Sequence, residues 1–203
     1  ALLDHQPAEA AVVGDGDPLV IIHTAAIQGK PRGAVLSHRG LLSCSLQTQA
    51  ALALTSEEVY LNILPLFHIG GLMAGLTVMQ AGGKNVILSR FDPGVAAQLI
   101  DREKVTLIGN FPPILAQLLD SRDAGGCSLS SLKNVFGIEL PETVKRFESL
   151  GTGRFWLIYG QTETMGLTCL CPNAERPGSA GRPGLLADVK IVDEFDRECA
   201  AGK

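Results

Sequence analysis

Strand-like and helix-like patterns alternate along most of this sequence, and that alternation most strongly limits the folds available to it. Short apolar runs are separated by amphipathic stretches roughly every 10 to 15 residues. The runs expected to form strands are 59–64, 85–88, 105–109, 132–136 and 154–158. Helices are expected at 39–54, 69–80, 92–104 and 141–149, with a further helix that opens at 112–113 and carries 114–119. Because strands joined through helices run parallel, the sequence predicts an α/β fold with a doubly wound, mostly parallel sheet and flanking helices.

The two ends of the sequence lack this alternation. Residues 1–17 are rich in Ala, Asp and Gly without periodicity, so we expect a lead-in linker there. Residues 18–165 are expected to form the α/β part of a domain. From Gly166 onward, Gly and Pro punctuate short apolar runs at 167–170 and 189–192. We therefore expect 166–203 to leave the sheet as a short β-rich segment of an adjoining subdomain.

Charge and cysteine content exclude several classes of protein. Seventeen basic and 21 acidic residues give a net charge of −4, and without a block of Lys and Arg a nucleic-acid partner is not expected. The most apolar stretch, 61–79, contains Asn, Pro, His and Gly, which favours core over a transmembrane segment, and we expect no secretory signal. Five scattered cysteines fit a reducing, cytoplasmic compartment. Cys169-x-Cys171 lacks the second pair or histidine cluster that a metal site needs.

A loop between two apolar runs carries the first candidate for function. Residues 20–22 are expected to form a buried strand, and a second strand is expected at 34–37. Between them, residues 29–33 (Gly-Lys-Pro-Arg-Gly) combine flexible backbone with two cations, which suits an anion such as phosphate. Taken alone, the same five residues more often form an ordinary surface hairpin. They also fail the Gly-x-x-x-x-Gly-Lys-Ser/Thr pattern.

Two further segments place polar side chains where a strand is expected to end. His68 lies in 65–71 (Pro-Leu-Phe-His-Ile-Gly-Gly), between an expected strand and helix. Ligands of open parallel sheets bind outside the carboxyl ends of the strands, so His68 is a candidate ligand-binding residue. A histidine that only caps its own helix is an equally good interpretation. Residues 159–164 (Tyr-Gly-Gln-Thr-Glu-Thr) offer an aromatic ring for a base, and a hydroxyl and a carboxylate that suit Mg²⁺. Without context, a polar turn is the better reading of 159–164.

Together these segments resemble the signatures of the adenylate-forming family, the acyl-CoA synthetases and their relatives. The family's phosphate loop is written Thr-Ser-Gly-Thr-Thr-Gly-x-Pro-Lys-Gly. The positions that fit this loop are Thr24, Gly29, Lys30, Pro31 and Gly33. The positions that depart from it are Ala25, Ala26, Ile27, Gln28 and Arg32, the last of these in place of lysine. Residues 65–68 match the family's Pro-Leu-Phe-His segment, and 159–163 match Tyr-Gly-x-Thr-Glu at every fixed position.

The resemblance, which spans 19–203, implies a role for each matched residue. It assigns His68 to the acyl carboxylate, Tyr159 to the adenine face, Thr162 to the α-phosphate and Glu163 to magnesium. Residues expected to take part in catalysis are His68, Thr162, Glu163 and Lys30. Residues expected to bind the nucleotide are Thr24, Ala25, Ala26, Gln28, Gly29, Lys30, Arg32, Gly137, Tyr159, Gly160, Gln161 and Thr162. Glu163 and Thr24 are the expected metal ligands, and of the adenine turn at 137–139 only Gly137 matches well.

The reaction that the resemblance implies joins a carboxylate, first of all a fatty acid, to the α-phosphate of ATP and releases pyrophosphate. The acyl group then passes to a thiol, commonly that of coenzyme A, with Mg²⁺ as the metal. The family's ribose-binding aspartate and its C-terminal domain with the catalytic lysine have no match here, so we expect the central piece of a larger N-terminal domain, inactive alone. A homo-oligomer is compatible with the sequence.

Other functions remain open on the sequence alone. An amino-acid-activating domain or an aryl-CoA ligase would carry similar motifs. A non-catalytic nucleotide-binding module and a purely structural fragment are two further alternatives. The enzyme reading requires Lys30 and Glu163 to lie close enough to share one triphosphate.

Overall fold

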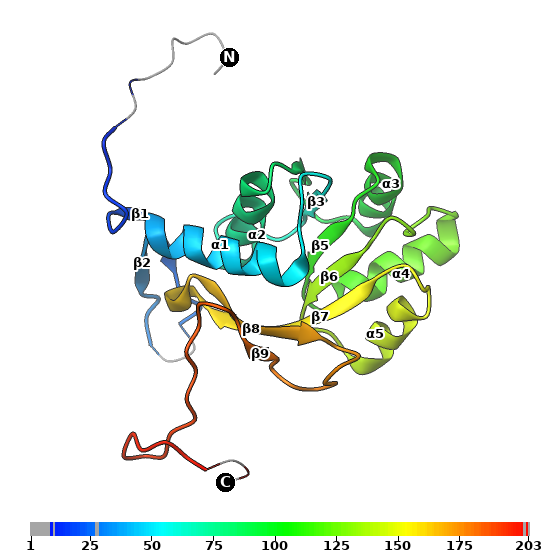
Figure 1. The fold of residues 1–203 in the computed structure, drawn as a ribbon. Helices are drawn as coiled ribbons and strands as arrows, with labels where there is room; N and C mark the ends of the chain where they lie inside the picture. Colours follow the sequence, from blue (N-terminus) through cyan, green and yellow to red (C-terminus); the bar gives the residue numbers. More distant parts are fainter. Residues whose placement is uncertain (1–8, 10, 27–28, 201, 203) are drawn as a thin grey trace.

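A large sheet between two layers of helices forms the body of the molecule, with a separate two-stranded hairpin beside it (Figure 1). The computed structural model describes residues 9, 11–26, 29–200 and 202. In spatial order the large sheet contains β4 (Lys84–Ile87), β3 (Val59–Asn62), β5 (Leu107–Asn110), β6 (Asn134–Gly137), β7 (Arg154–Gln161), β8 (Gly166–Pro172) and β9 (Arg182–Pro183). The hairpin contains β1 (Pro18–His23) and β2 (Gly33–Ser37).

The first five strands of the large sheet are parallel, as predicted. The helices that connect them are α2 (Ile69–Gln80), α3 (Pro93–Glu103), α4 (Ile114–Gly125) and α5 (Pro141–Glu148). The chain starts this sheet at β3, moves outward to β4 and then crosses back to β5 on the other side of β3. The strand order therefore reverses between β3 and β5, which defines a doubly wound sheet and its switch point.

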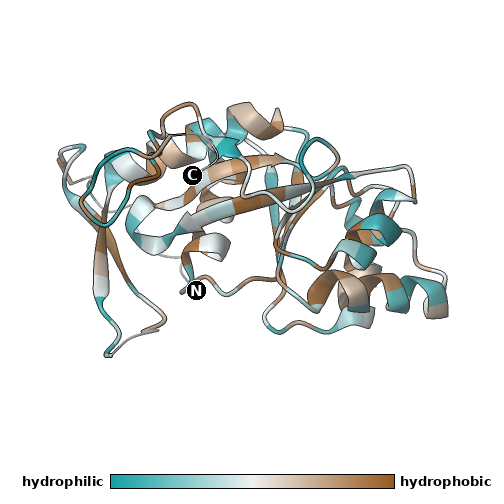
Figure 2. Cartoon of the chain, turned by 90° about the horizontal axis from the view of Figure 1, so that it is seen from below, coloured by the Kyte–Doolittle hydropathy of each residue, from teal (hydrophilic) through white to brown (hydrophobic). Residues whose placement is uncertain are grey.

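Helices cover both faces of the sheet and bury two hydrophobic cores. Side chains of α3, α4 and α5, such as Ile100, Leu118 and Phe147, pack on one face. The helices α1 (His38–Leu52) and α2 pack on the other face through residues such as Leu41 and Met73. Figure 2 shows hydrophobic residues along strands of the sheet, while residues of both kinds alternate along the helices. No helix within the described residues combines the length and apolar character needed to cross a membrane.

The large sheet does not end at Gly166, which corrects the expectation that the chain leaves it there. After β7 the chain reverses, and β8 pairs antiparallel with β7 while β9 pairs with β8. The amide of Gln47 in α1 donates to the carbonyl of Leu167 at 2.8 Å, so a buried contact with α1 holds β8 on the sheet. The assignment of 166–203 to an adjoining subdomain and the other domain limits stay predictions.

The strand expected at 189–192 is not formed. Its single ladder contact is an isolated bridge between Val192 and Glu198. Ile191 is 67% exposed, so this apolar run has no layer within the described residues to pack against. Residues 11–17 likewise contain no helix or strand.

The first apolar run is a strand, but it is only partly buried and lies outside the large sheet. Ile22 is 4% exposed whereas its neighbour Ile21 is 59% exposed. Successive side chains of a strand point to opposite faces, and a lone hairpin has one face against the protein and one toward solvent. The expectation of a buried strand at 20–22 is therefore met for the strand but only in part for its burial, and the second strand forms as predicted.

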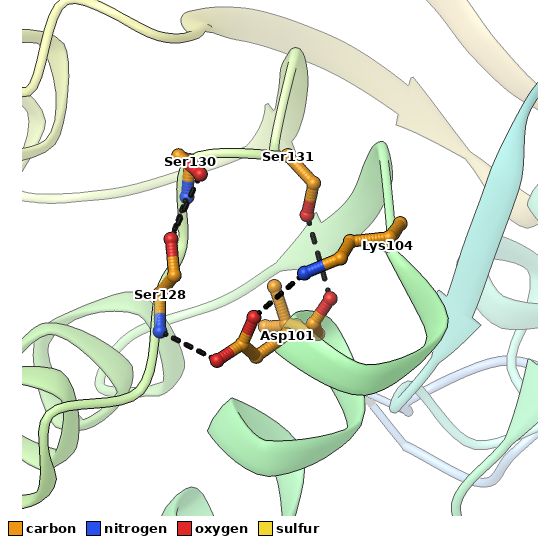
Figure 3. Close-up of polar contacts among 6 residues, drawn as sticks. Asp101, Lys104, Ser128, Ser130 and Ser131 are labelled. Atoms are coloured by element: carbon orange, nitrogen blue, oxygen red, sulfur yellow. Dashed lines mark hydrogen bonds and ion pairs between the residues drawn. The ribbon is translucent and has the colours of Figure 1, made fainter.

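Polar contacts around Asp101 join the end of α3 to the segment that leads into β6 (Figure 3). The Asp101 carboxylate accepts from Lys104 Nζ at 2.9 Å and from the backbone N–H of Ser128 at 3.1 Å. Ser131 Oγ also donates to the carbonyl of Ile100 at 3.4 Å. The hydrogen bond from Lys104, and then that from Ser128, hold the pKa of Asp101 below its ordinary value. This cluster lies at the amino ends of the strands.

We predict that Asp101→Asn lowers the unfolding temperature slightly at pH 7 and not at all in strong acid. A carboxylate whose pKa is lower in the folded state stabilises the fold above its unfolded-state pKa, and this stabilisation is lost as the pH falls through the folded-state pKa. Thermal unfolding of both proteins from pH 7 down to pH 2 tests this. Glu57→Gln, at an exposed carboxylate outside the cluster, is the control. An equal deficit at every pH would contradict the role of the charge.

Candidate active site

A cleft of about 640 Å³ opens at the carboxyl ends of the parallel strands. Sheets of this type bind ligands at the switch point because neighbouring loops there diverge to opposite faces. The cleft is lined by His23, Thr24, Ala25, Ala26, Lys30, Arg32, His68, Ile69, Phe111, Ile138, Ile158, Tyr159, Gly160, Gln161, Thr162 and Glu163. These residues come from the β1–β2 loop, the start of α2, the ends of β5 and β6, and the end of β7.

The loop between β1 and β2 is a hairpin, as its bare sequence suggests, and it also lines the cleft. The backbone N–H of Thr24 donates to the carbonyl of Arg32 at 2.9 Å, which continues the strand pairing beyond His23 and Gly33. The N–H of Arg32 donates to Thr24 Oγ1 at 3.3 Å. Gly29, with φ +91°, is not among the lining residues. Gln28 and Ile27 lie outside the described residues.

The segment after β7 brings its polar side chains to the same cleft. Tyr159 is 53% exposed, and a short 3₁₀ turn, η2 (Thr162–Thr164), follows the strand. Gly160 must be glycine, because a Cβ there would overlap the carbonyl of Gly166 in the returning strand. The Thr162 side chain is buried and Glu163 is exposed. The polar-turn reading therefore holds for Thr162–Thr164, whereas 159–161 still belong to β7. The side chains of 159 and 161–163 line the cleft.

The hairpin and the η2 segment support each other from positions far apart in the sequence. β2 contacts η2 directly. Met165, which follows η2, packs so close to α1 that a Cβ on Gly40 would lie 2.7 Å from its side chain. Lys30 and Glu163 consequently line one cleft rather than opposite flanks of the molecule. A shared cleft is compatible with the requirement that the two residues contact one triphosphate, which stays a prediction.

His68 caps α2 and also faces the cleft. Its Nδ1 accepts a hydrogen bond from the N–H of Gly70 at 3.1 Å, so the capping interpretation is confirmed. Because Nδ1 is an acceptor, the ring proton of the neutral histidine resides on Nε2, which leaves Nε2–H as a donor. The ring meets Phe111 edge-on, with centroids 6.1 Å apart. This aromatic contact joins the carboxyl ends of β3 and β5 at the switch point.

An apolar pocket of about 70 Å³ continues from the cleft between α2 and the sheet. His68, Ile69, Phe111, Ile158 and Gly160 line both spaces. The deeper wall consists of Leu64, Gly70, Met73, Asn110, Phe136, Gly137, Gly166 and Leu167. Gly137, which the resemblance places at the nucleotide base, lines this inner pocket, whereas its neighbour Ile138 lines the outer cleft.

Sequence reasoning missed His23, Ile69, Phe111 and Ile158 as cleft residues. It placed Ile138 in the turn at 137–139 but did not count it among the expected site residues. Phe111 and Ile138 each follow directly after a parallel strand, β5 and β6 respectively. Their position after a strand is a signal available from sequence, since residues there meet at one edge of a parallel sheet. His23 gives no such signal because it ends a strand of the separate hairpin.

The charges at the cleft suit a polyphosphate with a divalent cation. Among the described lining residues, Lys30 and Arg32 are cationic and Glu163 is the one carboxylate. No group of three or more His, Cys, Asp or Glu within the described residues could hold a metal ion by itself. A single carboxylate with nearby hydroxyls fits Mg²⁺, which keeps several waters and takes its remaining ligands from substrate phosphates. All five cysteines are free, including the pair at 169 and 171.

Comparisons with known proteins agree with this geometry. Residues 2–203 match the family described as AMP-binding enzyme. The chain is 36% identical over 179 residues to 4-chlorobenzoate–CoA ligase from Pseudomonas sp. (strain CBS-3). The matched region covers 85% of this chain and 34% of that protein. It therefore spans about a third of the length of this relative.

Two solved structures show the same fold. A structure from Rhodopseudomonas palustris, provisionally named a long-chain-fatty-acid CoA ligase, superposes with a TM-score of 0.92 at 44% identity, covering 97% of this chain and 49% of that one. O-succinylbenzoate coenzyme A synthetase from Bacillus subtilis, solved with ATP and a magnesium ion, gives a TM-score of 0.86 at 23% identity. The match covers 100% of this chain and 43% of that one. This chain belongs to the AMP-binding enzyme family, the adenylate-forming enzymes that include the CoA ligases.

Proposed function

We propose that this chain is the nucleotide-binding part of an ATP-dependent acyl-CoA synthetase. The parent reaction joins a carboxylate to the α-phosphate of ATP, releases pyrophosphate and passes the acyl group to coenzyme A. The observation that carries this proposal is the shared cleft of the β1–β2 loop and the segment 159–163. Those two segments are the ones that resemble the family's phosphate loop and its Tyr-Gly-x-Thr-Glu motif.

Charge neutralisation is the first task of the cleft in this reaction. A substrate carboxylate and a triphosphate repel each other, by about 4 kcal/mol for two unit charges about 4 Å apart at an effective dielectric constant near 20. Lys30 and Arg32 line the cleft on one side and offset this repulsion. Glu163 would hold Mg²⁺, which neutralises phosphate charge when bound. No protein nucleophile is needed, because positioning and electrostatic stabilisation supply most of the acceleration in such transfers.

The remaining cleft residues orient the two substrates. Tyr159 would stack on the adenine, and the buried hydroxyl of Thr162 would donate to the α-phosphate. Ala25 and Ala26 stand where the family pattern has hydroxyl and glycine residues, so phosphate contacts from this loop depend on backbone N–H groups, Thr24 and the two cations. Since ionic contacts at exposed positions are screened by salt, nucleotide affinity should fall as ionic strength rises.

The acyl group is proposed to lie against the apolar pocket behind His68, which at about 70 Å³ takes only the part of the group next to the carboxylate. The Nε2–H of His68 would donate to the substrate carboxylate at the mouth of this pocket, where it lines both spaces. A fatty acid is the first candidate, because the relative that is 44% identical is named a fatty-acid ligase. An aromatic acid is the second, because Phe111 and Phe136 line the pocket and a 36% identical relative acts on 4-chlorobenzoate by its name.

Substitution of Lys30 should weaken binding of ATP more than binding of AMP. The prediction follows from the proposed contact with the outer phosphates, where loss of a charged hydrogen bond reduces affinity roughly 10- to 100-fold. Calorimetric titration of native protein and Lys30→Ala with Mg²⁺·ATP and with AMP measures the two losses. Lys133→Ala, an exposed lysine at the amino end of β6, is the matched control.

Glu163→Gln should remove the dependence of ATP binding on Mg²⁺ while AMP binding changes little. The same titrations with and without the metal test this variant. If native protein binds ATP and AMP equally, the chain is a phosphate-blind nucleotide-binding module. If it binds neither, the structural-fragment alternative replaces the proposal.

We further propose that the 203-residue chain binds nucleotide without completing the reaction, because it spans a third to a half of the ligases that it resembles. Pyrophosphate release with ATP, Mg²⁺, coenzyme A and either decanoate or 4-chlorobenzoate should stay at the background of a protein-free control. Sustained turnover with either acid would contradict this and would identify the acyl substrate at the same time.

A further inference from the structure

The turn that follows β6 is held in place by one buried residue, Asn110. This asparagine ends β5 and is fully buried. Its backbone carbonyl accepts from the N–H of Ile138 at 3.3 Å, and its side-chain Nδ2 donates to the carbonyl of Ile138 at 2.8 Å. Both backbone polar groups of Ile138 are thus bonded to the same residue. Within the described chain, no other side chain forms a hydrogen bond with Ile138.

The Asn110 side chain forms two further hydrogen bonds. Nδ2 donates a second hydrogen bond to Glu139 Oε2 at 3.2 Å. Oδ1 accepts from the N–H of Leu115 in the first turn of α4 at 2.9 Å. The residue before α4, Pro113, provides no side-chain cap, so this contact satisfies one of the helix's otherwise unpaired donors. The side chain therefore has one allowed orientation, with its amide nitrogen toward the turn and its oxygen toward α4.

The backbone also brings Asn110 and the turn unusually close. Gly137 is the parallel-sheet partner of Asn110 and has φ +149°. A Cβ at Gly137 would overlap the carbonyl oxygen of Asn110, so only glycine permits this approach. Because the two backbones lie so close at this point, the side-chain amide of Asn110 is within hydrogen-bonding distance of Ile138 and Glu139.

The turn lies beside the proposed base-stacking residue. β6 and β7 pair in parallel as far as Gly137 opposite Leu157, and Ile138 follows directly after this last paired residue. Ile138 is 54% exposed and Tyr159 is 53% exposed, and both line the outer cleft. A planar ring that stacks on Tyr159 would meet Ile138 as the neighbouring wall.

We propose that Asn110 is a positioning residue for the base of the nucleotide: its amide fixes the turn at Ile138 and so sets the wall beside Tyr159. The inference rests on the proposed function, since it assumes that a nucleotide binds in this cleft. It assigns base affinity to Asn110, which does not line the outer cleft where the base is proposed to bind, and leaves phosphate affinity to the hairpin loop and Glu163.

Asn110→Asp tests the proposal with almost no change in shape. The aspartate still accepts from Leu115, so the start of α4 is preserved. It cannot donate, and it places an oxygen against the carbonyl of Ile138 and the carboxylate of Glu139. We expect the dissociation constant of AMP to rise about 10-fold or more, while that of Mg²⁺·tripolyphosphate, which has no base, stays within about two-fold because the turn is not expected to contact phosphate.

A reversed pair provides the rescue experiment. Adding Glu139→Gln to Asn110→Asp restores a hydrogen bond between the two positions with donor and acceptor exchanged. Part of the AMP affinity should return, whereas Glu139→Gln alone, which keeps the acceptor for Asn110, should bind AMP nearly as the native chain does. Thermal unfolding of each variant separates a local effect on the turn from loss of the fold, because loss of the fold reduces affinity for both ligands.

The outcomes distinguish this inference from the function on which it rests. If native protein binds AMP and Asn110→Asp leaves the ratio of AMP to tripolyphosphate affinity unchanged, the positioning role is wrong and the function stands. If native protein binds neither ligand, both are wrong. If Asn110→Asp does not fold, Asn110→Ala, which removes the amide donor without adding a charge, decides. An unchanged affinity ratio in that variant overturns the inference.

Discussion

Parallel pairing of β3, β5, β6 and β7 is the constraint on which the rest of the structure depends. It brings the carboxyl ends of these strands to one edge of the sheet, and the reversal of order between β3 and β5 opens that edge. His68, Phe111, Ile138 and Tyr159 come from four different strand ends and meet there. Without this pairing, residues separated by almost a hundred positions would have no reason to share a cleft.

Cationic groups reach this edge from a hairpin that is not part of the sheet. Lys30 and Arg32 are placed by the pairing of β1 with β2, by the burial of Ile22 and by contact with η2. The two halves of the cleft are therefore joined by side-chain packing, such as Met165 against Gly40, rather than by a continuous ladder of backbone hydrogen bonds. The placement of the β1–β2 loop against the segment after β7 consequently depends on packing around α1.

The parts predicted from sequence are those with a local signal. The parallel sheet and its helices follow from periodicity and from caps such as Asp92, whose side chain accepts from Val95 at 2.9 Å as the sequence indicates. Two contacts that connect distant positions were not predicted: the hydrogen bond from Gln47 to Leu167, 120 positions apart, and the hydrogen bond from Asn110 to Ile138 in the turn after β6. Such contacts form only in the folded chain, so no local sequence pattern predicts them. The cleft was predicted through family resemblance, because 29–33 and 159–164 read alone favour ordinary turns.

The most direct test of the central claim is to locate one metal–nucleotide complex relative to both segments. Binding of Mn²⁺·ATP broadens the amide NMR signals of residues near the paramagnetic ion. The account predicts broadening at Lys30 and Arg32 in the hairpin loop together with Thr162 and Glu163 after β7, while signals at the far end of the sheet, such as Ser128, stay sharp. Broadening of only one of the two segments, or of neither, would contradict the existence of a shared nucleotide site.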